Sequence, residues 1–168
     1  MTAILPNIFL ILSLLLSPLP EREKAMVAKE TTKAISVLST ERCHNWLLSI
    51  GSNPEELGKV IASTQFYDAK KSKIPLRYSG ILNGKLRTNL PMWVWAKEYK
   101  FGLVQASLNN HMVIYANDYR LLKYEHIIHE SLHFYFEDYD IDLAQRMGIK
   151  IHGRNTMPIS DEVRKHCK

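Results

Sequence analysis

The spacing of apolar residues changes twice along the chain, and these changes constrain the fold more than any other feature of the sequence. Residues 21–50 carry apolar side chains at helical spacing, and Gly51 ends that run. A second helix is predicted from the capping side chain, proline and acids of residues 52–56, continuing to about Thr64. The helical spacing is lost from Ile74 onward, which predicts a different kind of secondary structure there.

The middle of the chain predicts a small sheet. Asn83-Gly84 is the strongest short signal for a β-hairpin, and residues 92–95 are aromatic and β-prone. Residues 102–108 and 111–115 flank a turn at residues 109–110, so we expect two paired antiparallel strands. These segments form one small sheet and not a second domain.

Helical spacing returns after this sheet. Asn117-Asp118 can cap a helix, and residues 119–136 form the longest helical pattern in the second half. A short helix is predicted over residues 141–147, followed by a final turn at 161–168. Together the patterns predict a single α+β domain over residues 21–168, with N-terminal helices, a small mainly antiparallel sheet and a later helix packed on it.

The N-terminal segment has a separate character. Residues 4–19 contain no charge and include two leucine- and isoleucine-rich blocks. This stretch is shorter than the about 20 apolar residues of a membrane span, but it matches the apolar region of a secretory signal. Residues 1–20 are therefore interpreted as a signal peptide or short membrane anchor, with a buried apolar arm as the alternative. The prediction is an extracytoplasmic protein, secreted or anchored in the envelope, with a cytoplasmic location as the runner-up.

The distribution of charge limits which kinds of partner the protein is expected to bind. The net charge is +5, but the basic residues are scattered, which favours a solvated basic surface over a nucleic-acid patch. Membrane contact is expected only through residues 1–20.

Cys43 and Cys167 either form one disulfide between an early helix and the C-terminal tail or remain two free thiols. Neither cysteine has the C-x-x-C spacing of a zinc ligand.

The helix at residues 119–136 contains the sequence His129-Glu130-Ser131-Leu132-His133, an H-E-x-x-H motif. Residues four apart lie one above the other on a helix, so the imidazoles of His129 and His133 can bind one ion from the same side. Zn²⁺ accepts such nitrogens at about 2.0–2.1 Å and keeps one position for water. Glu130 then lies beside that water and can act as its general base.

A third protein ligand must come from elsewhere in the chain. The candidates are Glu137, Asp138, Asp140, His152, Glu162 and His166. The metzincin pattern is excluded, because Phe136 and Tyr139 occupy the places of its glycine and third histidine. His152 is preferred: the 18 intervening residues can return the chain to the helix, and Gly153 permits a close approach. His126 shares the helix face but is interpreted as a donor, substrate contact or surface residue.

Other polar residues receive simpler interpretations. The acidic run from Glu137 to Asp142 is interpreted as a solvated turn, because it lacks the glycine and spacing of an EF-hand. The candidates for stabilising an oxyanion are Tyr115, Tyr135, Tyr139 and Arg154. The tryptophans Trp46, Trp93 and Trp95 are interpreted as core residues.

A strand at residues 114–117, the H-E-x-x-H helix and the later His152-Gly153 together resemble the SprT-like zincins over roughly residues 74–157. In that family a strand precedes the metal-binding helix, and a downstream His-Gly supplies the third ligand. The resemblance implies a zincin-like fold in which His129, His133 and His152 hold Zn²⁺ and Glu130 is the base. A second resemblance, to the ImmA/IrrE-like peptidases, implies Glu162 as the third ligand instead.

The function predicted from these features is a zinc-dependent metallopeptidase acting on protein or peptide substrates. A hairpin strand that precedes the metal-binding helix offers a free edge along which an extended substrate can lie. Two alternatives stay open: a non-catalytic metal-binding protein of the cell envelope, and a SprT-type protease acting on nucleic-acid-bound proteins.

Overall fold

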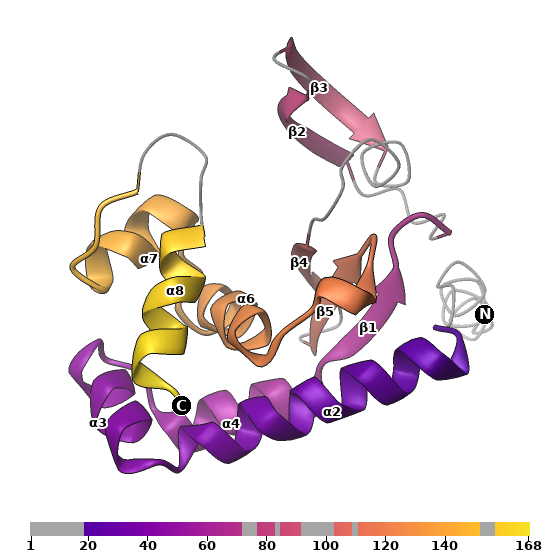
Figure 1. Ribbon diagram of the computed structural model, residues 1–168. Coiled ribbons are helices and arrows are strands. Elements are labelled where there is room, and N and C mark those ends of the chain that lie inside the picture. The colour runs from indigo at the N-terminus through magenta and orange to yellow at the C-terminus, as the bar shows by residue number, and fades with distance from the viewer. Residues whose placement is uncertain (1–18, 72–76, 83–84, 92–102, 109–110, 152–156) are drawn as a thin grey trace, which may run out of the picture.

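The computed structural model describes residues 19–71, 77–82, 85–91, 103–108, 111–151 and 157–168 (Figure 1). The helices are α2 (Glu21–Leu38), α3 (Glu41–Ser49), α4 (Pro54–Ser63), the 3₁₀ turn η1 (Tyr119–Leu121), α6 (Tyr124–Phe136), α7 (Asp140–Arg146) and α8 (Met157–His166). The strands are β1 (Gln65–Asp68), β2 (Arg77–Leu82), β3 (Lys85–Pro91), β4 (Leu103–Leu108) and β5 (His111–Ala116). The predicted α+β class is confirmed over these residues.

The first helical run is divided in two. The structure ends α2 at Leu38 and begins α3 at Glu41, where a single run over residues 21–50 was predicted. The hydroxyls of Ser39 and Thr40 donate to the carbonyls of Ser36 and Val37, at 2.8 Å each. Short polar side chains of this kind compete with the backbone for helical hydrogen bonds and so favour a break.

The start of α4 agrees with the prediction. The side chain of Asn53 accepts hydrogen bonds from the backbone N–H groups of Glu55 and Glu56, at 3.0 and 3.1 Å. Pro54 takes the first helical position, where its missing N–H is not needed. The sequence of this cap therefore fixes where the helix begins.

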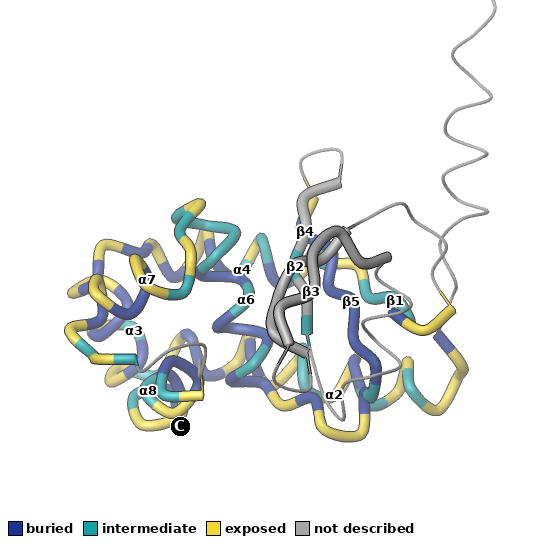
Figure 2. The backbone as a smooth tube through the Cα atoms, turned by 90° about the horizontal axis from the view of Figure 1, so that it is seen from above, coloured by how far each residue is buried: buried dark blue, intermediate teal, exposed yellow. Residues whose placement is uncertain are grey.

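The main sheet has the strand order β1-β5-β4. β4 and β5 pair antiparallel in the predicted register, from Leu103 opposite Ala116 to Leu108 opposite His111. β1, which was not predicted, pairs parallel with β5, so the sheet is mixed. β5 is buried from Met112 to Ala116 and runs through the centre of the sheet (Figure 2).

The predicted hairpin is present as a separate sheet. β2 and β3 pair antiparallel, with Leu82 opposite Lys85 across the Asn83-Gly84 position. The expected strand at residues 92–95, which includes Trp93 and Trp95, lies outside the described residues.

The helical pattern at 119–136 is also interrupted. η1 ends at Leu121, and Leu122 and Lys123 are extended before α6 begins at Tyr124. Asp118 caps η1 by accepting from the Arg120 N–H, in agreement with the predicted capping role. The final helix, α8, is longer than the turn predicted at 161–168.

α6 is the central helix of the molecule, packed against α2, α4 and α8 and against β4 and β5. Ile127, Ile128 and Leu132 are fully buried on it. Cys43 of α3 and Cys167, directly after α8, form a disulfide, so the bonded alternative is confirmed. Among the described residues, no helix has the length and apolar character needed to cross a membrane.

Candidate metal centre

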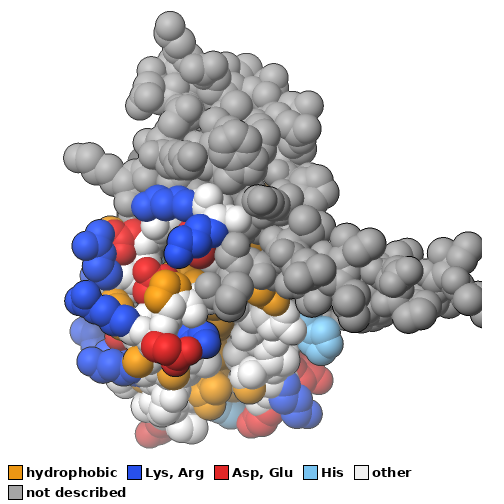
Figure 3. Space-filling model, turned by 90° about the vertical axis from the view of Figure 1, so that its right-hand side faces the viewer, with side chains coloured by type: hydrophobic (Ala, Val, Ile, Leu, Met, Phe, Trp, Pro, Cys, Tyr) orange, Lys and Arg blue, Asp and Glu red, His pale blue; other side chains and the backbone are white. Residues whose placement is uncertain are grey.

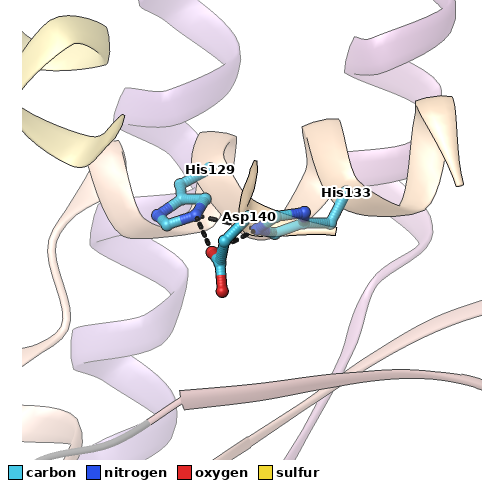
Figure 4. A group of neighbouring side chains, drawn as sticks. All are labelled: His129, His133 and Asp140. Atoms are coloured by element: carbon cyan, nitrogen blue, oxygen red, sulfur yellow. Dashed lines mark hydrogen bonds and ion pairs between the residues drawn. The ribbon is translucent and has the colours of Figure 1, made fainter. Parts of the chain in front are cut away.

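The two histidines of the motif converge on one side of α6. The Nε2 atoms of His129 and His133 are 2.9 Å apart, and their ring centroids are 4.8 Å apart (Figure 4). The side chain of His129 is 6% exposed and that of His133 is 12% exposed. The opposite face of α6 carries the buried Ile127 and Ile128, so burial of that face directs both imidazoles to the same side.

A sharp turn after α6 brings a carboxylate to the same point. Glu137, the residue that ends α6, is left-handed with φ 56°, and α7 begins three residues later at Asp140. The Oδ1 atom of Asp140 is 3.1 Å from His133 Nε2 and 3.5 Å from His129 Nε2. The ligand atoms of these three residues all lie within 4.8 Å of one another (Figure 4).

The spacing of these atoms fits a divalent cation. Ligands about 2.0–2.1 Å from a tetrahedral Zn²⁺ lie roughly 3.3–3.4 Å from one another. The observed separations of 2.9, 3.1 and 3.5 Å bracket that value. Two imidazole nitrogens and one carboxylate oxygen suit Zn²⁺ and also other first-row divalent ions. The structure therefore contains a candidate metal-binding group made of His129, His133 and Asp140.

Hydrogen bonds on the far side of each ring set its orientation. His133 Nδ1 is 2.8 Å from the carbonyl oxygen of Asp138, which can only accept, so Nδ1 carries the proton and donates. The neutral ring then presents the Nε2 lone pair to the centre. His129 Nδ1 is 2.9 Å from the hydroxyl of Ser160, on α8. Contacts of this kind typically orient histidine ligands.

The electrostatics of the group favour positive charge. Burial alone would lower the pKa of His133, but its hydrogen bond to Asp140, the charge of Glu130 and the Asp138 carbonyl raise that pKa above the usual value. Burial likewise tends to raise the pKa of Asp140, yet hydrogen bonds from His129 and His133 hold it well below its usual range. Asp140 is thus ionised at neutral pH and attracts a cation to the point between the rings.

Glu130 lies next to the first histidine and is partly buried. No hydrogen bond or ion pair joins its carboxylate to another residue within the described part of the chain. Its charge nevertheless acts on His133.

The other candidate ligands do not lie with the two histidines within the described residues. His152, the preferred third ligand, lies outside the described residues and stays a prediction. Glu162 accepts from Lys165 and His166 at 2.9 Å each and is not part of the histidine group. His126 accepts the backbone N–H of Lys123 through Nδ1, at the start of α6. Among the described residues, Asp140 takes the third position.

The acidic run after α6 has a role that sequence reasoning missed. It was interpreted as a solvated turn, but Asp138 supports His133 through its carbonyl and Asp140 faces both histidines. The run itself was the available signal, since Asp140 was one of six candidates. The reversal of the chain at Glu137 had no glycine or asparagine to mark it. Ser160 had no sequence signal of any kind.

The four candidate oxyanion donors differ in how accessible their side chains are. Tyr115 is 1% exposed within β5, and burial together with the charge of Tyr67 raises its pKa to about 12. Tyr135 accepts from the Asn53 N–H and donates to Glu56, which commits it to α4. Tyr139, directly before Asp140, is 83% exposed and stays available. Arg154 lies outside the described residues.

Basic and acidic side chains are interspersed on one face of the molecule. On the face shown in Figure 3, Lys and Arg side chains lie among Asp and Glu side chains over the described residues. Several basic side chains are paired, for example Lys24 with Glu21 and Arg120 with Asp118, at 2.6 Å each.

No protein-family model, curated protein or solved structure matches this chain. The geometry around His129, His133 and Asp140 therefore carries the functional argument by itself. On that geometry the chain is an α+β protein with a candidate site for a metal ion, enclosed by α6, α7 and α8.

Proposed function

We propose that the chain is a zinc-dependent hydrolase that cleaves peptide bonds. The observation that carries this proposal is the convergence of His129 Nε2, His133 Nε2 and Asp140 Oδ1 on one point, with Glu130, whose negative charge acts on His133, next along the same helix. A purely structural metal site closes around its ion with four protein ligands. Among the described residues the group offers three ligands next to an acid, and three ligands with an adjacent base are the arrangement of a hydrolytic site.

The residues have distinct roles in this proposal. A bound Zn²⁺ would lower the pKa of a water at the site towards about 7 and polarise a substrate carbonyl. Glu130 takes the proton of the attacking water and returns it to the leaving amine. The exposed hydroxyl of Tyr139 is the available donor for the oxyanion.

The position of β4 supports an extended substrate. Among the described strands, β4 pairs only with β5, on one of its two edges. α6 packs against β4, which places this strand next to the helix that carries both histidines. A peptide that adds to this edge by backbone hydrogen bonds would run beside the centre.

The disulfide supports an oxidising compartment outside the cytoplasm. Structural disulfides persist in secreted and periplasmic proteins and are rare in the cytosol. The Cys43–Cys167 bond thus agrees with the interpretation of residues 1–20 as an export signal or anchor.

The decisive experiment separates metal binding from cleavage. Wild type and Glu130→Gln are compared for zinc content and for hydrolysis of an unfolded protein substrate. We expect Glu130→Gln to keep its zinc and lose hydrolysis by more than about 100-fold, since general-base catalysis contributes 10²–10⁴. Glu137→Gln, an exposed acid at the end of the same helix, is the matched control and should retain both.

Two outcomes contradict the proposal. Hydrolysis that survives Glu130→Gln would exclude this carboxylate as the base. Zinc binding without hydrolysis of any protein substrate by wild type would instead favour a non-catalytic metal-binding protein.

A further inference from the structure

α8 reaches the candidate metal centre through the buried side chain of a serine. Ser160 is 2% exposed, and its hydroxyl is 2.9 Å from His129 Nδ1. The two residues are 31 positions apart in the chain. A residue of the C-terminal helix therefore contacts the ring of a ligand on the central helix.

The chemistry of the ring fixes the direction of this hydrogen bond. A neutral histidine that presents Nε2 to a cation carries its proton on Nδ1. Nδ1 of His129 therefore donates to Ser160 Oγ when the centre is loaded. The hydroxyl can accept this proton, so the bond is compatible with the metal-binding tautomer and holds the ring at one rotation, which is the usual function of such contacts.

The position of α8 depends on contacts made by the rest of the fold. A helix of 10 residues is too short to be stable alone in water, where about 12–15 residues are marginal. Ile159 and Val163 bury one face, and Arg164 donates to the buried carboxylate of Glu125 at 3.0 Å. At the end of α8, Cys167 is bonded to Cys43 of α3.

A ring contact adds to the disulfide at the same end. His166 stacks on Trp46 of α3, with ring centroids 5.0 Å apart and planes 7° apart. The C-terminal end of α8 is thus joined to α3 both covalently and by packing, while its N-terminal half carries Ser160 to the centre.

We propose that Ser160 is a positioning residue for the metal ligand His129, and that the Cys43–Cys167 disulfide sets the metal affinity of the centre by holding α8 against α6. This inference rests on the metal centre of the proposed function, but not on its peptidase activity. Reduction by an external dithiol breaks the S–S bond, forms two thiols and converts the dithiol to a disulfide. α8 then loses its covalent link, and the Ser160–His129 contact is held only by packing.

The test measures metal affinity, not hydrolysis. Zn²⁺ affinity is determined by competition with a chromophoric chelator, and Co²⁺ absorption reports the ligand geometry. The proteins are wild type, Ser160→Ala, the double variant Cys43→Ala/Cys167→Ala and the triple combination. Loss of a contact that orients a ligand typically weakens metal binding 10–100-fold, so we expect Ser160→Ala to lose about tenfold.

Ser131→Ala is the matched control. Ser131 is a fully buried serine on the metal-binding helix, and its hydroxyl donates to the Ile127 carbonyl at 2.6 Å, not to a histidine. Its removal should leave the zinc affinity and the Co²⁺ spectrum unchanged. Thermal unfolding of the metal-free proteins shows whether each variant is folded.

The coupling between disulfide and Ser160 has its own signature. If the disulfide acts through Ser160, its removal weakens binding in wild type and has little further effect in Ser160→Ala, so the two losses are not additive. A phosphine reductant should lower the affinity of wild type and leave the double cysteine variant unchanged.

The failures of the two proposals are distinguishable. If wild type and Ser160→Ala bind zinc equally, the positioning role is wrong although the metal centre stands. Additive losses, or a reductant without effect on wild type, would overturn the role of the disulfide. Absence of zinc binding by wild type would refute the centre and this inference together, whereas absence of hydrolysis alone leaves the inference intact. The comparison of Ser160→Ala with Ser131→Ala does not require the cysteine variants to fold.

Discussion

The two halves of the candidate metal centre are supported in different ways. His133 is oriented by the Asp138 carbonyl, five residues further along the same turn. His129 is oriented by Ser160, on a helix that the disulfide ties to α3. One half therefore forms with the local chain, while the other requires the tertiary structure to be in place. A ligand pair that looks symmetric in the sequence is asymmetric in what maintains it.

The largest effect is expected where the two halves meet. Asp140→Asn replaces the carboxylate that contacts both Nε2 atoms with a neutral, weaker ligand. Zinc affinity should fall by more than about 100-fold, beyond the range typical of residues that only support a ligand. Chelator competition measures this loss. Asp142→Asn, an exposed acid two residues further along the chain, is the control. Equal zinc affinities for Asp140→Asn and Asp142→Asn would exclude Asp140 as a ligand.

The raised pKa of His133 predicts how zinc affinity depends on pH. Its folded pKa lies above 6.5, so protons compete with the metal from above pH 6.5 downward. Zinc affinity should be constant at higher pH and fall by up to about tenfold per pH unit below that pKa for each proton displaced. Titrations between pH 5.5 and 8.5 test this, and an affinity that does not change over this range would contradict the assignment of His133 as a ligand.

A substitution far from the site tests how the position of α8 supports His129. Arg164→Ala leaves the Glu125 carboxylate, 7% exposed, without the partner that joins α8 to α6. Because Arg164 is itself half exposed, we expect a loss of about 1–2 kcal/mol in the free energy of unfolding. Zinc affinity should fall with it. Lys165→Ala breaks a more exposed pair with Glu162 and should cost less than about 0.5 kcal/mol. Denaturant unfolding compares the two, and equal losses would contradict this role of Arg164.

The smallest effect concerns the turn that serves His133. Glu137 is left-handed, a conformation that glycine adopts without steric cost. Glu137→Gly should raise the free energy of unfolding by about 0.5–1 kcal/mol and leave zinc affinity unchanged, because Asp138 and Asp140 keep their places. A stability gain accompanied by lost zinc would show that the side chain of Glu137 contributes to the centre.

Features with local causes could be predicted from the sequence. The cap at Asn53, the paired strands on either side of residues 109–110 and the placement of both histidines on one helix face follow from side chains a few residues apart. The interruptions at Ser39 and Leu122 were missed because single polar or extended residues decided them within an otherwise helical pattern.

Features that depend on residues far apart in the chain could not be predicted from the sequence. β1 has four residues and is recognisable only through its parallel partner β5, about 50 positions later. Asp140 required knowledge of the backbone at Glu137, and Ser160 required knowledge of how α8 packs on α6. The choice of His152 followed from the reach of the intervening chain, from Gly153 and from a resemblance, and it stays a prediction; within the described residues, Asp140 lies beside the histidines.

The disulfide also makes the domain a covalent ring. It joins residues 124 positions apart, which removes freedom from the unfolded chain worth about 4–5 kcal/mol in the loop-closure model. Everything between Cys43 and Cys167, including the strands of both sheets and α6, lies inside that ring. A single backbone cut within it by a protease would leave one molecule of unchanged mass apart from the added water. Electrophoresis would resolve two fragments only after reduction, so a nicked and an intact population can coexist unnoticed in an oxidised preparation.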